Sequence, residues 1–208
     1  AAAASQGAMG EGYPDRGARA RRGTRAGGET AGRSPRRGGL VYTSGRVTAL
    51  ARFRSPLGTL AVEASDAGVV GIRFGGVERA RPPITARTRE HLEAALQALA
   101  DYFAGKPPRL PALDLRGSPF QMRVWRALGE IPWGDVRTYG ELARSLGSAG
   151  GARAVGGASA RNPVVVLVPC HRLVAAGGRL GGYAGGLRVK ARLLAHEAAH
   201  APALRRET

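Results

Sequence analysis

The sequence predicts an α+β protein in which a small antiparallel-sheet unit precedes a helical unit that contains a helix-turn-helix. Three observations predict this class. Apolar and polar residues alternate over 47–74, with two turns between the alternating runs. The apolar spacing then changes to the helical period over 87–104. Finally, two short helices joined by a glycine-containing turn are indicated between 138 and 160.

The N-terminal segment, residues 1–46, differs in composition from the rest of the chain. It consists mainly of Ala, Gly, Arg, Ser and Pro, with few large apolar side chains. Such a segment cannot bury enough apolar surface to offset its chain entropy, so we expect a disordered basic tail. It carries 9 arginines and 3 acidic residues, a net charge of +6, and the rest carries 23 basic and 12 acidic residues, a net charge of +11. The expected folded part is therefore basic on its own, which favours a nucleic-acid partner.

Residues 47–110 are expected to form a first, α/β domain. Its three strands are alternating runs at 47–54, 60–64 and 70–74. The helix that follows places one apolar face on Leu92, Ala95, Leu96, Leu99 and Phe103. Glycine and two prolines at 105–108 end this helix, and residues 111–117 are expected to be a linker.

Residues 118–198 are expected to form a second, mostly helical domain, followed by a short tail at 199–208. Ser118 before a proline predicts a helix start with Pro at the first helical position. Thr138 and Glu141 match a capping box, which predicts the start of the first helix of the helix-turn-helix.

The second helix of the predicted helix-turn-helix, within 150–160, is poor in large side chains. Gly156 and Gly157 in a helix interior cost about 1 kcal/mol each relative to alanine. Arg153 is the one long side chain of this segment. Two interpretations stay open: the helix packs closely on a neighbouring element, or its backbone closely approaches nucleic acid with Arg153 inserted.

The chain contains a single cysteine, Cys170, which directly precedes His171 and closely follows the apolar run 164–168. The run predicts a buried strand. A thiol reacts as thiolate, and a nearby imidazole favours that form, so the pair can be a nucleophile and its base. A lone cysteine can equally be an inert buried side chain, and the pattern alone leaves both interpretations open. One cysteine excludes an internal disulfide and a cysteine-rich zinc site.

The run 161–172, with its Pro-Cys-His-Arg motif, resembles the active-site signature of the O6-alkylguanine-DNA alkyltransferases. Residues 151–158 are similar to the recognition helix of that family. Residues 182–187 and 190–197 are similar to its C-terminal loop and helix. The resemblance is continuous over the second expected domain and looser over the first.

This resemblance implies a ribonuclease-H-like first domain and a winged-helix-like second domain. It implies a cytoplasmic monomer, associated with the nucleoid in a bacterium, that binds double-stranded DNA containing alkylated guanine. O6-alkylguanine, and also O4-alkylthymine, would be flipped out of the duplex and would lose the alkyl group to Cys170 in a single, self-inactivating turnover. No cofactor, no metal and no membrane are implied, and no segment approaches the roughly 20 apolar residues of a membrane span.

The resemblance also implies roles for individual residues. Cys170 would be the nucleophile, His171 its base through a bound water, and Glu197 the acceptor that orients His171. Tyr139 would donate to a ring nitrogen of the departing guanine. The DNA-binding residues would be Ala152, Arg153, which fills the gap left by the flipped base, Gly156, Ser159 and Asn162, which ties the helix-turn-helix to the cysteine loop. The substrate pocket would be lined by Val168, Tyr183 and Ala184.

Three other functions compete with this one. A non-catalytic adaptor that binds lesions on the same fold would lack the reactive cysteine, so Cys170 argues against it. A helix-turn-helix regulator could use the basic tail as an electrostatic anchor, but a glycine-rich helix offers little for reading bases. A thiol hydrolase is the weakest alternative, because no oxyanion hole can be identified from the sequence.

Overall fold

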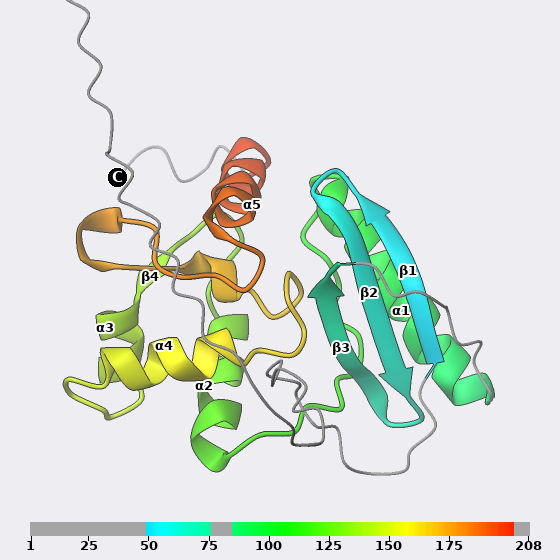
Figure 1. Ribbon diagram of the computed structural model, residues 1–208, viewed down its shortest axis with the longest axis horizontal. Coiled ribbons are helices and arrows are strands. Elements are labelled where there is room, and N and C mark those ends of the chain that lie inside the picture. Colours follow the sequence, from blue (N-terminus) through cyan, green and yellow to red (C-terminus); the bar gives the residue numbers. More distant parts are fainter. Residues whose placement is uncertain (1–48, 76–84, 202–208) are drawn as a thin grey trace, which may run out of the picture. The chain divides into compact units, whose positions relative to one another are not determined.

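Figure 1 shows the computed structural model, which describes residues 49–75 and 85–201. The predicted disordered tail at 1–46 and most of the predicted C-terminal tail at 199–208 lie outside the described residues. Within the described ranges, none of the helices is both long enough and apolar enough to cross a membrane.

The first half of the described chain is a three-stranded antiparallel sheet covered on one face by a helix (Figure 1). Its elements are β1 (Ala49–Ser55), β2 (Gly58–Ser65), β3 (Gly68–Phe74) and α1 (Ala86–Phe103). The strands pair in chain order, with Phe53 opposite Leu60 and Val62 opposite Ile72. This confirms the predicted meander and helix, and the mixed α/β class with a small antiparallel sheet.

The face that α1 turns toward the sheet differs slightly from the predicted one. Leu92, Ala95 and Leu99 are buried as expected, whereas Leu96 and Phe103 are only partly buried. Tyr102, which was not among the predicted residues of this face, is also buried. The helix therefore delivers one buried polar group into the interior.

The segment predicted as a linker, 111–117, is hydrogen-bonded to β3. The Val69 N–H donates to the Ala112 carbonyl at 2.8 Å, and the Asp114 N–H donates to the Val69 carbonyl at 2.9 Å. Gly68 has a φ of +148°, and a Cβ there would lie 2.7 Å from the Ala112 carbonyl oxygen. Glycine is therefore required for the segment to approach the strand this closely.

The second half contains four α-helices, two short parallel strands and two 3-10 turns. The α-helices are α2 (Pro119–Gly129), α3 (Tyr139–Ser145), α4 (Ala152–Ala160) and α5 (Leu187–Ala199). The short strands are β4 (Arg137–Thr138) and β5 (Leu173–Val174), and the 3-10 turns are η1 (Cys170–Arg172) and η2 (Ala176–Gly178). Both predicted helix starts are confirmed, since Ser118 with Gln121 and Thr138 with Glu141 form complete capping boxes.

The apolar run 164–168 is buried as predicted, but the prediction of a strand is wrong. Val164 makes one bridge to Ile72 of β3, and the chain then turns, with the Val168 N–H donating to the Val164 carbonyl at 3.0 Å. Val166 has a φ of +74°, a region that β-branched residues rarely adopt. Asn162 contributes to the turn, because its side chain accepts from the Val164 N–H at 3.0 Å. Periodicity cannot distinguish a buried turn from a buried strand when every residue is apolar.

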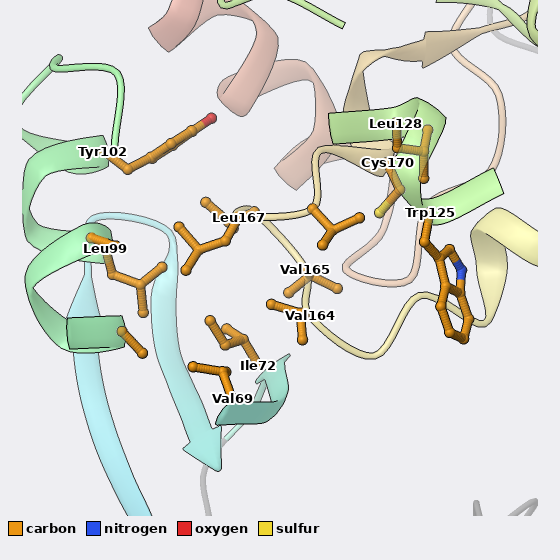
Figure 2. Packing of buried hydrophobic residues seen from close by; sticks show 14 of the residues in the cluster. Val69, Ile72, Leu99, Tyr102, Trp125, Leu128, Val164, Val165, Leu167 and Cys170 are labelled. Carbon is orange, nitrogen blue, oxygen red and sulfur yellow. The ribbon is translucent and has the colours of Figure 1, made fainter. Parts of the chain in front are cut away.

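This turn lies at the centre of the core. In Figure 2, Val164, Val165 and Leu167 lie between Val69 and Ile72 of the sheet on one side and Leu128 of α2 on the other. The turn at 164–168, which leads directly to Cys170, is thus packed against both halves of the described chain.

Candidate active site

Cys170 opens η1 immediately after the buried turn, and its side chain points into the protein (Figure 2). The residue is 4% exposed. Burial raises the pKa of the thiol to about 11, although the Asn162 hydrogen bond, a backbone N–H and the Lys190 charge each act to lower it. At neutral pH the resting group is therefore a protonated thiol that requires a base before it can attack.

Asn162 holds the cysteine loop in place through both ends of its amide. Its Nδ2 donates to the Val168 carbonyl at 2.8 Å and to the Cys170 Sγ at 3.1 Å. With Oδ1 engaged by the Val164 N–H, the buried side chain joins the end of α4 to the start of η1. A donor aimed at sulfur stabilises thiolate more than thiol.

Replacing Asn162 with aspartate keeps the acceptor for Val164 but puts a negative charge in place of the donor to sulfur. We expect the pKa of Cys170 to rise further, so that iodoacetamide alkylates Cys170 about ten-fold or more slowly at pH 8. Intact-protein mass against time measures this rate. Gln121→Glu adds the same charge at the start of α2 and should leave the rate unchanged; equal rates for Asn162→Asp and the parent would contradict the role of the donor.

His171 and Glu197, predicted to act together, are 26 positions apart in the sequence and are brought into contact. The His171 Nε2 lies 2.6 Å from the Glu197 Oε1, and both side chains are fully buried. Because a carboxylate only accepts, Nε2 carries the proton and Nδ1 has the free lone pair. Among the described residues, Nδ1 has no hydrogen-bond partner. Burial lowers the pKa of His171, against the opposing hydrogen bond and charge of Glu197, so the ring is neutral at pH 7 and can accept a proton.

The Glu197 carboxylate is held by four further donor groups from three residues. Arg172 donates from Nε to Oε2 at 2.8 Å and from Nη2 to Oε1 at 3.1 Å, the Gly134 N–H donates to Oε2 at 3.2 Å, and the Tyr102 hydroxyl donates to Oε1 at 2.9 Å. Burial alone raises the pKa of Glu197, but the hydrogen bonds and charges of His171 and Arg172 outweigh it and lower the pKa to about 2. The carboxylate is therefore ionised at every physiological pH.

Two of these partners, Arg172 and Tyr102, were not predicted as site residues. Arg172 belongs to the Pro-Cys-His-Arg motif, and arginine commonly binds carboxylates through two hydrogen bonds, so the sequence did contain a signal for this role. Tyr102 carries no such signal, because only the folded chain brings the end of α1 to the end of α5.

A third residue that sequence reasoning missed is Lys190, which is fully buried without a carboxylate partner in the described residues. Its Nζ donates to the carbonyls of Leu173 and, at 3.1 Å, Gly181, and it lies 5.7 Å from the centre of the Tyr139 ring. The charge of Lys190 is one of the influences that lower the pKa of Cys170. A buried cation near a thiol favours the thiolate.

Tyr139, the predicted donor to the leaving group, begins α3 and contacts the loop before α5. Its hydroxyl donates to the Gly182 carbonyl at 3.3 Å. A Cβ on Gly181 would lie 2.5 Å from the Tyr139 ring, so the loop needs glycine there to approach this side chain.

The three predicted pocket residues lie in different surroundings. Val168 is buried, and its carbonyl already accepts from the Cys170 N–H at 2.8 Å and from Asn162. Tyr183 is half-buried, its ring centre is 6.3 Å from that of His171, and its hydroxyl has no partner in the described part of the chain. Ala184 is exposed.

The predicted DNA-binding residues of α4 fall on two faces. Arg153 is exposed, and Ala152 and Gly156 are half-buried. Ser159 is buried at 8% exposure, so its side chain lies on the inner face of α4, and its contact with DNA stays a prediction. Asn162 is also buried and acts within the protein.

The glycines of α4 distinguish between the two open interpretations of this helix. A Cβ on Gly156 would meet the Tyr139 ring at 3.9 Å, and one on Gly157 would meet Arg161 Nη1 at 3.5 Å, both ordinary contacts. Packing within the described protein therefore does not require glycine at either position. The small residues leave an open backbone surface, which favours close approach of a separate molecule.

The geometry assembles a thiol, a neutral imidazole with a free nitrogen, and an ionised carboxylate that orients the imidazole. This arrangement is suited to nucleophilic attack by sulfur. Within 49–75 and 85–201, no group of three or more His, Cys, Asp or Glu side chains is placed to hold a metal ion.

Comparisons with known proteins agree on one family. Residues 119–199 match the family model described as "6-O-methylguanine DNA methyltransferase, DNA binding domain". A methylated-DNA–protein-cysteine methyltransferase of Mycolicibacterium paratuberculosis is 45% identical over 153 residues, which cover 72% of this chain and 92% of that protein. The crystal structure of the Mycobacterium tuberculosis O6-methylguanine methyltransferase has a TM-score of 0.64 and 39% identity, covering 76% of this chain and 96% of that one. The same protein in complex with DNA has a TM-score of 0.62 and 40% identity, covering 73% and 94%.

Proposed function

Because this chain belongs to the family of methylated-DNA–protein-cysteine methyltransferases, we propose that it repairs alkylated DNA by direct reversal, with Cys170 as the acceptor. The substrate is double-stranded DNA that contains O6-alkylguanine, and by extension O4-alkylthymine. One observation carries the assignment to Cys170. Its thiol accepts a hydrogen bond from Asn162, and the next residue in the chain, His171, is paired with Glu197. The relatives named above support the reaction and the partner.

The reaction is a displacement at the alkyl carbon. The thiol proton passes to the His171 Nδ1, through a bound water, while Glu197 stabilises the imidazolium through Nε2. Sulfur then forms a bond to the carbon, and the carbon–O6 bond breaks with its electron pair left on guanine. Guanine regains a proton at its ring, which balances the proton lost by the thiol. The products are a thioether at Cys170 and an ordinary guanine, and no cofactor enters the balance.

The backbone of α4 and two side chains would bring the base to the sulfur. The open backbone of α4 would approach the duplex, and the exposed Arg153 would fill the space left by the flipped base. Tyr139, which now donates to Gly182, would donate instead to a ring nitrogen of the departing guanine. Burial raises the pKa of Tyr139, so its hydroxyl stays protonated and able to donate.

The turnover would be single. The chain contains no second cysteine that could remove the alkyl group from Cys170. Removing the alkyl group from the thioether would expel the Cys170 thiolate from an unactivated carbon, which a neutral imidazole cannot achieve, so each molecule would react once.

Finer features of the fold belong to the same proposal. We assign residues 47–110 to a ribonuclease-H-like domain, 111–117 to the connection, and 118–198 to a winged-helix-like catalytic domain that acts as a monomer. A cytoplasmic protein associated with the nucleoid is the corresponding expectation for location.

To test the proposal, the protein is incubated with a duplex oligonucleotide that carries a single O6-methylguanine, and the mass of the intact protein is then measured by mass spectrometry. A gain of one methyl group, absent in Cys170→Ala, is the expected result. Binding to the damaged duplex without a change of mass would instead support the lesion-binding adaptor.

A further inference from the structure

Resting on this proposed function, we propose that Tyr102 is a positioning residue for His171 and Glu197, the pair that activates the thiol. Tyr102 comes from α1, in the sheet half of the chain, and touches neither Cys170 nor the position of the base in any described contact. It acts through Glu197 and His171, by holding the carboxylate in place and by adding a second acceptor that reinforces the tautomer imposed by Glu197. The catalytic half of the chain would then depend on one hydroxyl that it does not itself supply.

The contacts of the Tyr102 hydroxyl support this role. It donates to the Glu197 Oε1 at 2.9 Å and lies 3.3 Å from the His171 Nε2. Oε1 is also the oxygen that faces Nε2 at 2.6 Å. The three atoms therefore form a closed triangle in the fully buried interior.

The hydrogen-bond capacities of these atoms dictate one arrangement. A phenolic hydroxyl has one proton, which Tyr102 gives to the carboxylate, so its oxygen can only accept from Nε2. Glu197 can also only accept. Nε2 of His171 thus faces two acceptors and must carry the proton, which leaves the lone pair on Nδ1 for the thiol. Burial and the nearby Glu197 charge raise the pKa of Tyr102, so the hydroxyl does not ionise in any working range.

The position of Tyr102 is fixed by His196, from the helix that carries Glu197, and by two neighbouring aromatic rings. Its backbone carbonyl lies 2.7 Å from the His196 Nε2, and its ring centre lies 5.0 Å from that of Trp133 and 5.1 Å from that of Phe103. In Figure 2 the ring extends from α1 with its hydroxyl directed away from the helix. A side chain held on both its backbone and its ring has little freedom to place the hydroxyl elsewhere.

Other charged or titratable groups surround the pair, and all would remain in a Tyr102 variant. The groups that interact with His171, Glu197 or Cys170, or that pack on Tyr102, are Arg172, Tyr139, Tyr183, Lys190 and His196. A change in the pH dependence on removing one hydroxyl would therefore be assigned to that hydroxyl.

The test compares Tyr102→Phe with the parent in methyl transfer from the O6-methylguanine duplex between pH 6.5 and pH 9.5. Removing one acceptor from Nε2 and one donor from Glu197 should slow transfer about three- to ten-fold at pH 7. The loss should shrink to about two-fold or less at pH 9.5, because hydroxide then forms thiolate without the imidazole. Rate constants refer to active molecules, counted from the methyl groups accepted at completion.

Leu96→Ala is the matched control, since Leu96 is a partly buried apolar side chain of the same helix and packs against the same core. It should lower stability and keep the pH profile of the parent. The proposal for Tyr102 is overturned if Tyr102→Phe reacts at the parent rate throughout, or if its loss is equal at every pH. Failure of the parent itself to accept methyl would overturn the proposed function instead, so the two failures are distinguishable.

Discussion

Glu197→Gln is expected to destabilise the protein by about 3–5 kcal/mol, because it leaves the Arg172 guanidinium buried without a counter-charge. The NH2 group of the new glutamine would also face the hydrogen-bond donors of Arg172 and Tyr102, which now donate to the carboxylate. Urea unfolding at pH 7 measures the free energy of unfolding. Glu93→Gln removes the same charge from the exposed face of α1 and should change that free energy by less than about 0.5 kcal/mol.

The pH dependence of stability follows from the same carboxylate. Its pKa is about 2 in the folded protein, against a usual value of 4.5. A lowered pKa contributes stability that is present above pH 4.5 and is lost as the pH falls from about 4.5 toward about 2, a contribution of about 3 kcal/mol. Glu197→Gln should therefore show a flatter fall of the unfolding free energy across this window. An equally steep fall in the variant would contradict the assignment of the acid-sensitive stability to Glu197.

His171→Ala is expected to give the largest loss of rate short of removing the thiol itself. With the pKa of Cys170 near 11, thiolate is scarce at pH 7 unless a base takes the proton. General-base catalysis contributes roughly 10²–10⁴-fold, so transfer at pH 7 should fall by about that factor. The loss should diminish steadily as pH rises, since the thiolate fraction increases about ten-fold per pH unit below the thiol pKa. Rapid-quench assays with the O6-methylguanine duplex measure the loss of rate at pH 7 and its decrease at higher pH.

The control for this variant is His91→Ala, which removes a partly exposed imidazole from α1. It should keep the parent rate at every pH. A loss in His171→Ala that is the same at pH 7 and pH 9.5 would mean that His171 serves packing and not proton transfer.

Local signals in the sequence predicted much of the fold. Ser118 and Thr138 each stand three residues before a partner that completes a capping box, so two helix starts could be predicted within a residue or so. The alternation in 47–74 likewise predicted the meander, because one face of that sheet is buried under α1 and period two is then visible. Such signals depend only on neighbours in the chain.

The turn at 164–168 shows where local signals end. Five consecutive apolar residues are compatible with a strand, and their turn depends on the side chain of Asn162 and on a bridge to Ile72 far away in the sequence. The strained φ of Val166 is likewise imposed by its surroundings and not by its own preference.

The site was predictable only in part, for the same reason. The contact of His171 with Glu197 was expected from a resemblance and not from spacing. Tyr102 and Lys190 lie among apolar positions of their helices, and nothing in their local sequence marks them as neighbours of the pair or of the thiol. The sequence likewise did not show that Ser159, expected to contact DNA, lies on the inner face of α4.

Cys170 is proposed to accept one alkyl group per molecule, and a stoichiometric titration tests this. The protein is mixed with increasing excess of the O6-methylguanine duplex, and restored guanine and methylated peptide are both quantified. Restored guanine is expected to reach a plateau at one equivalent of protein, with all of the methyl on the peptide that contains Cys170. Restoration beyond one equivalent, methyl on any other residue, or no restoration at all would contradict the proposal.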